Sequence, residues 1–111
     1  MERTTRQYPR FNAALPVELH ATGVAAPLRA QTHDICLGGF YVELAYTQPV
    51  STKLEIVFWI GETKILARGV VVSNHPSFGN GIKFTDVAAE DRDRLQQFLG
   101  TLKPFGGSPT A

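Results

Sequence analysis

The chain has 111 residues, of which 43% are hydrophobic, and its 11 Lys and Arg residues nearly balance its 10 Asp and Glu residues. This length fits a single domain with one core and excludes most two-domain arrangements. The net charge of +1 argues against a protein that binds DNA or RNA over a broad basic face, although a few well-placed arginines can still bind a small anionic ligand.

The sequence carries no recognisable sorting signal. No stretch approaches the roughly 18 consecutive apolar residues of a membrane-spanning helix, and the polar start does not resemble a secretory signal. Cys36 is the only cysteine, which leaves neither an internal disulfide nor a cysteine-based metal site. These features predict a cytoplasmic protein without membrane insertion.

Residues 1–13 are polar and predict a flexible N-terminal arm. Their first ten positions hold three arginines and one acid, namely Arg3, Arg6, Arg10 and Glu2. Pro9 restricts the residue before it to an extended backbone, so a helix is not expected here. Residues 104–111, which are rich in Gly and Pro, predict a disordered tail.

Between the arm and the tail, residues 14–103 are predicted to form the folded domain. Runs of apolar, β-branched and aromatic residues, bounded by Gly, Pro and Asn, predict six strands. The strands are expected at residues 17–20, 28–35, 40–44, 54–60, 64–73 and 81–84. Gly69 predicts a bulge or bend inside the fifth strand, and residues 74–80 predict a loop.

An apolar stripe at helical spacing predicts one helix at the end of the domain. Its members are Leu95, Phe98, Leu99 and Leu102. Acidic residues lie at or near the expected start of the helix, where the macrodipole favours negative charge; they are Asp86, Glu90 and Asp91. Six short strands and one helix predict a mainly-β fold, a closed or nearly closed antiparallel barrel with a C-terminal helix.

Two clusters could bind a ligand, and the first is the R-x-x-x-R pattern of Arg6 and Arg10. In an extended chain these side chains point the same way about 13 Å apart. A guanidinium can bind a phosphate through two hydrogen bonds, or the O6/N7 edge of guanine. The pattern therefore suits a ligand with several anionic or planar acceptor groups, and the alternative is a solvated arm without a function.

The second cluster runs from Asp34 to Gly39, where one predicted strand ends and the next begins. Asp34 and Cys36 are two residues apart and should face the same way. A carboxylate here can accept hydrogen bonds from the N1–H and N2–H₂ edge of guanine, and Gly38 and Gly39 allow a ligand to approach the backbone. The alternative is a β-turn in which Asp34 binds neighbouring N–H groups.

Together, and in this order, the two clusters resemble the motifs of the PilZ domain family, which binds the bacterial second messenger cyclic di-GMP. Arg6 and Arg10 match the R-x-x-x-R motif of the family. Asp34 and Gly39 match its [D/N]-x-S-x-x-G motif, in which Cys36 replaces the usual serine. The resemblance covers about residues 3–102 and implies a six-stranded antiparallel β-barrel with one C-terminal α-helix.

The resemblance also implies a non-enzymatic adaptor or effector that binds cyclic di-GMP and acts on an unidentified effector protein in motility, biofilm or exopolysaccharide control. The implied ligand-binding residues are Arg6, Arg10, Asp34, Cys36 and Gly39, with Arg3, Gln7 and Gly38 as additional candidates. No cofactor or metal is implied. Because a thiol is a weak hydrogen-bonding group, Cys36 is expected to weaken binding about 2- to 13-fold relative to serine.

Two alternatives stay open. One is a PilZ-like protein-interaction module that does not bind cyclic di-GMP, which only Cys36 favours. The other is a small barrel that binds single-stranded nucleic acid, which the near-neutral charge disfavours. Catalysis has little support, because the histidines at 20, 33 and 75 lack metal-ligand spacing and the serines at 51, 73 and 77 lack a nucleophile motif.

Overall fold

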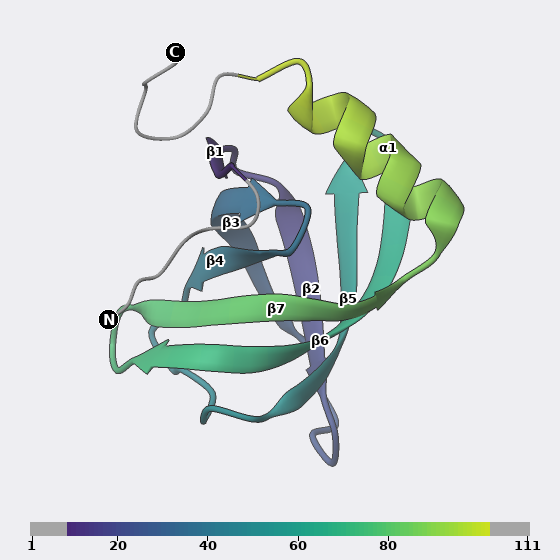
Figure 1. The fold of residues 1–111 in the computed structure, drawn as a ribbon. Coiled ribbons are helices and arrows are strands. Elements are labelled where there is room, and N and C mark those ends of the chain that lie inside the picture. Colours follow the sequence, from purple (N-terminus) through teal and green to yellow (C-terminus); the bar gives the residue numbers. More distant parts are fainter. Residues whose placement is uncertain (1–8, 103–111) are drawn as a thin grey trace.

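The computed structural model describes residues 9–102, which form a β-barrel with one helix (Figure 1). The strands are β1 (Phe11–Asn12), β2 (Pro16–Ala21), β3 (Leu28–Cys36), β4 (Gly39–Glu43), β5 (Lys53–Ile60), β6 (Thr63–His75) and β7 (Gly79–Val87), and the helix is α1 (Ala89–Leu99). Each strand predicted from the sequence is present, with boundaries that shift by a few residues.

The strands close into a barrel in which every pairing is antiparallel. Around the wall the order is β3-β2-β5-β6-β7-β4, and pairing between β4 and β3 closes the ring. The short β1 pairs with the end of β3 that lies beyond the β2 contact. This arrangement confirms the predicted six-stranded antiparallel barrel with a C-terminal helix.

Alternating side chains fill the barrel, as the period of the sequence predicts. Along β5, Leu54, Ile56 and Phe58 are all buried. The ring of Phe84 lies between those of Phe40 and Phe58, at centroid distances of 5.7 and 5.9 Å. Helix α1 lies at the end of the barrel near the end of β5 (Figure 1), and its predicted apolar stripe contributes Leu95 and Leu99 to the core.

The β6–β7 hairpin is longer than the sequence indicated. Residues 74–80 were predicted as a loop, but β6 runs to His75 and β7 begins at Gly79, so only three residues turn the chain. Asn80 is fully buried because its side-chain amide bonds the backbone of Gln48 and of Ser73. These distant contacts override the local turn signals of Pro76 and its neighbours.

Two other local predictions have different outcomes. The strand pairing shifts register between Arg68 and Gly69, which confirms the predicted bulge. A Cβ atom at Gly69 would lie 2.7 Å from the carbonyl oxygen of Lys83, so the bulge needs glycine. Asp86 lies within β7 rather than at the start of α1, whereas Glu90 and Asp91 occupy the first turn of the helix as predicted.

The folded chain begins earlier than residue 14. Phe11 is buried and pairs with Ile35, so the flexible-arm prediction does not hold for residues 11–13. The buried Thr32 hydroxyl accepts a hydrogen bond from the Leu15 N–H at 2.9 Å and donates to the carbonyl of Ala13. The predictions for the rest of the arm and for the tail fall mainly on residues 1–8 and 103–111, outside the described residues.

Candidate ligand-binding site

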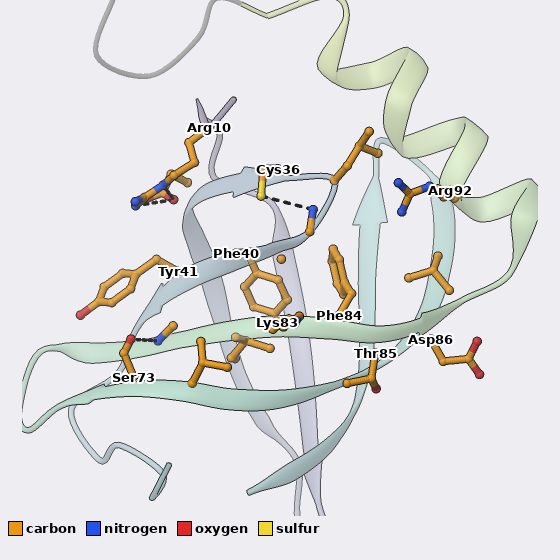
Figure 2. Close-up of a pocket in the computed structure, with 18 of the residues that line it drawn as sticks. Arg10, Cys36, Phe40, Tyr41, Ser73, Lys83, Phe84, Thr85, Asp86 and Arg92 are labelled. Atoms are coloured by element: carbon orange, nitrogen blue, oxygen red, sulfur yellow. Dashed lines mark hydrogen bonds and ion pairs between the residues drawn. The ribbon is translucent and has the colours of Figure 1, made fainter. Parts of the chain in front are cut away.

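A groove of about 690 Å³ opens on the outer surface of the barrel, between β3, β4, β6, β7 and α1 (Figure 2). Its lining includes the predicted site residues Arg10, Asp34, Cys36, Gly38 and Gly39. The volume lies in the usual range for small-molecule sites, about 300–1,000 Å³. Three further predicted site residues, Arg3, Arg6 and Gln7, lie outside the described residues, and their place in a site stays a prediction.

Arg10 and Asp34 form an ion pair at one end of this groove. The Nε and Nη2 atoms of Arg10 each lie 2.8 Å from Oδ1 of Asp34. The Nδ1 atom of His33 lies 3.0 Å from Oδ2, and because an ionised carboxylate only accepts hydrogen bonds, Nδ1 must carry the proton. The Asp34 side chain is only 4% exposed, whereas that of Arg10 is 29% exposed.

These contacts keep Asp34 ionised. Burial alone raises the pKa of Asp34, but the hydrogen bonds and charges of Arg10 and His33 outweigh burial and hold its pKa below the ordinary value. The same hydrogen bond raises the pKa of Arg10. Asp34 therefore fixes the Arg10 guanidinium at the groove. A carboxylate has about four acceptor positions, and the hydrogen bonds from Arg10 and His33 occupy one position on each oxygen.

The turn between β3 and β4 explains the residues that follow Asp34. The Sγ atom of Cys36 accepts a hydrogen bond from the Gly38 N–H at 3.3 Å, so the thiol closes the turn where the family motif has a serine. A Cβ atom at Gly39 would lie 2.0 Å from the carbonyl oxygen of Ile82 on β7. Gly39 is therefore required for barrel closure, a role that its place in the sequence motif does not indicate. Its predicted role in giving a ligand room stays a prediction.

The groove is also lined by residues that belong to neither motif: Tyr41, Ser73, His75, Lys83 and Arg92. Strand alternation could have identified two of them. Tyr41 and Lys83 each lie between buried neighbours in the sequence and therefore point outward. The other three come from distant elements, and no short-range pattern brings them next to Asp34.

The groove is suited to an anionic ligand larger than a single phosphate. Figure 2 shows Arg10 and Arg92 at opposite ends, with Lys83 between them. Among residues 9–102, no group of three or more His, Cys, Asp or Glu side chains is arranged to hold a metal ion. In the same part of the chain, no helix has the length and apolar character needed to cross a membrane.

Comparison with known proteins identifies the family. A sequence model of the PilZ domain matches residues 4–100, which is most of the chain. The chain belongs to the PilZ domain family. Comparison with curated protein sequences gave no match.

Several solved structures resemble this PilZ domain. The Bacillus subtilis inhibitor of motility, MotI/DgrA, is 23% identical with a TM-score of 0.73 and matches over 91% of this chain but 53% of its own. This chain thus spans about half the length of that protein. The Escherichia coli YcgR PilZ domain, solved with c-di-GMP, is 16% identical with a TM-score of 0.71 over 89% of this chain and 92% of its own. The CeSA PilZ domain of a cellulose-synthesizing bacterium is 17% identical with a TM-score of 0.65 over 83% and 96%. At these identities the likeness establishes the fold alone.

Proposed function

We propose that this PilZ domain binds cyclic di-GMP in the groove and passes the signal to another protein without catalysing a reaction. The observation that carries the proposal is the Arg10–Asp34 ion pair, which joins the two family motifs at one end of the groove. Structures of the YcgR PilZ domain and of Borreliella burgdorferi PlzA contain c-di-GMP and share this fold, which supports the same ligand here.

Each motif residue has a chemical role in this proposal. Arg10, oriented by Asp34, binds a phosphate or the O6/N7 edge of a guanine, and Arg6 supplies a second guanidinium from the arm. A further acceptor position of Asp34 receives a guanine N–H. Cys36 holds the β3–β4 turn in place of serine, while Gly39 keeps the backbone beside it accessible. Arg3, Gln7 and Gly38 are additional contacts.

The domain passes the signal on by binding an unidentified effector protein in the cytoplasm. Through that protein it controls motility, biofilm formation or exopolysaccharide. Binding changes the surface that the groove presents to that protein. The preformed Arg10–Asp34 pair favours this sensor function over an interaction module that has lost its ligand, because such a module has no need for an oriented guanidinium in a groove.

Isothermal titration of the full chain with cyclic di-GMP tests the proposal. We expect saturable binding, and Arg10→Ala should cost more than about 2 kcal/mol, or about 30-fold in affinity. Arg29→Ala is the matched control, because Arg29 also pairs with a carboxylate, at 3.1 Å from Glu18, but its side chain is 75% exposed and outside the groove. Its affinity should stay within about twofold of the unchanged chain.

Two results would reject the sensor function. Absence of saturable heat with the unchanged chain at tens of micromolar ligand would favour the interaction module. Binding of single-stranded oligonucleotides with a steep salt dependence, and no preference for cyclic di-GMP, would favour the nucleic-acid alternative. The thermal unfolding of each variant must be recorded beside its titration, because Arg10 also contributes to the fold.

A further inference from the structure

Tyr41 lies beside the Arg10–Asp34 ion pair but belongs to neither motif. It is directly opposite Asp34 in the pairing of β3 with β4, whereas the next pair, Ile35 and Phe40, points into the core. Side chains of directly opposed residues project from the same face of a sheet. Figure 2 shows the Tyr41 side chain projecting from β4 at the same end of the groove as Arg10.

Two histidines hold the Tyr41 ring. The His33 ring meets it nearly perpendicularly, at a centroid distance of 6.3 Å and an angle of 85°. The His75 ring lies 5.8 Å from it on the other hairpin, and the Tyr41 hydroxyl is 3.2 Å from Nδ1 of His75. Because His33 also bonds Asp34, the ring is fixed relative to the carboxylate. A side chain that is already held loses less conformational entropy when a ligand binds.

Glycines on the strand next to Tyr41 make room for the Tyr41 ring itself and for the Ser73 side chain. On β7 the residue paired with Tyr41 is Gly81, and Gly79 is two positions away. A Cβ atom at Gly79 would lie 2.9 Å from both Cε2 and the hydroxyl oxygen of the Tyr41 ring. At Gly81 a Cβ would lie 2.3 Å from Oγ of Ser73. The two glycines therefore let the Tyr41 ring and the Ser73 hydroxyl pack against the backbone of β7, which holds the ring against the barrel wall.

We propose that Tyr41 is the surface on which one guanine base of the bound dinucleotide stacks. The inference rests on the proposed function and adds to it a recognition element for the flat face of the base. Arg10 and Asp34 bind hydrogen-bonding edges and phosphate, while Tyr41 contacts the π face, and together they fix the orientation of one base. Aromatic side chains are effective at this task because every base presents a π face.

Two substitutions separate stacking from other contributions of the side chain. Tyr41→Phe keeps the ring and removes the hydrogen bond to His75, so affinity for cyclic di-GMP should stay within about threefold. Tyr41→Leu keeps apolar bulk but removes the ring, and affinity should fall about 5- to 150-fold, the range for loss of one base–aromatic stack. Tyr46→Leu is the matched control, because Tyr46 is 85% exposed and lies outside the groove, and it should have no effect.

A spectroscopic readout tests the stack in the unchanged protein. In proton NMR, the aromatic signals missing from the Tyr41→Leu spectrum should shift on titration with cyclic di-GMP, and the guanine H8 signal should move upfield. Binding by the unchanged chain with no affinity loss in Tyr41→Leu and no such shifts would overturn the stacking role and leave the proposed function intact. No binding by the unchanged chain would overturn both. If Tyr41→Leu unfolds, the Tyr41 signals are assigned from the Tyr41→Phe spectrum instead, and their shifts in the unchanged protein decide.

Discussion

Replacing Arg10 with Met should destabilise the barrel itself, apart from any effect on ligand binding. The Asp34 carboxylate is 4% exposed, accepts a hydrogen bond from Nε of Arg10 at 2.8 Å and lies 2.8 Å from Nη2 of the same guanidinium. Met keeps the apolar stem of Arg10 and removes the guanidinium, so Asp34 would stay buried with His33 as its only described side-chain partner. An ionised group that loses its partner while buried carries its full desolvation cost.

The expected cost can be bounded from these contacts. Breaking a fully buried ion pair costs about 3–5 kcal/mol, and a single hydrogen bond to a charged group contributes about 1.5–3 kcal/mol. Arg10 is 29% exposed and His33 stays bound to Asp34, so Arg10→Met should fall in the upper part of the lower range, at about 2–3 kcal/mol. Asp34→Asn should cost less, about 1–2 kcal/mol, because water can still reach the Arg10 guanidinium.

A double-mutant cycle measures the interaction directly. The unfolding free energies of Arg10→Met, Asp34→Asn and the double variant follow from urea denaturation with Trp59, the only tryptophan, as the fluorescent probe. Since the two residues are in contact, we expect a coupling energy of about 1–2 kcal/mol. Additive effects, within about 0.5 kcal/mol, would refute the ion pair as a preformed element of the site.

Three further outcomes follow from the same region. The contacts of Asp34 lower its pKa, so the stability that Asp34 contributes is present above the ordinary aspartate pKa and is lost as the pH falls through the lowered value. The difference in unfolding free energy between the unchanged chain and Asp34→Asn should therefore be full at pH 7 and disappear in strong acid. Cys36→Ser should leave cyclic di-GMP affinity equal or tighten it in titration, since a hydroxyl can take over the turn hydrogen bond; clear weakening would give the thiol another role. Gly39→Ala should lower the unfolding free energy by more than about 3 kcal/mol, because its Cβ would meet the Ile82 carbonyl. The control Gly61→Ala, where nothing lies within 4 Å but φ is +62°, should lower it by about 1–2 kcal/mol. Equal costs would contradict the steric argument.

Features of the fold that depend on neighbours in sequence could be predicted. The alternation of Leu54, Ile56 and Phe58 marks a strand with one buried face, and Gly69 marks a bulge. Both signals act over a few residues, and both are confirmed. The stripe that includes Leu95 and Leu99 likewise predicts the helix.

Features of the fold that depend on contacts between distant residues could not be predicted from the sequence. Phe11 is a single aromatic in a polar segment, and its burial arises from pairing with the end of β3. The turn residues around Pro76 indicated a loop, but the buried amide of Asn80, which bonds the backbone of Gln48 and Ser73, extends both strands of the hairpin. Such contacts join segments that no local window contains.

The residues of the candidate site likewise fall into those that the sequence could predict and those that it could not. The motifs located Arg10 and Asp34, and only their known combination in a family linked two common patterns to one ligand. Strand alternation could have added Tyr41, whose neighbours on either side are buried. The positions of His75 and Arg92 along the groove depend on the β6–β7 hairpin and on the packing of α1, which the sequence pattern does not specify.

The titration of the unmodified full chain with cyclic di-GMP tests the central claim most directly. We expect saturable binding that Arg10→Ala weakens by about 30-fold or more and that Arg29→Ala leaves within about twofold. A titration without saturable heat at tens of micromolar ligand, from a chain whose thermal unfolding confirms that it is folded, would rule out the sensor function.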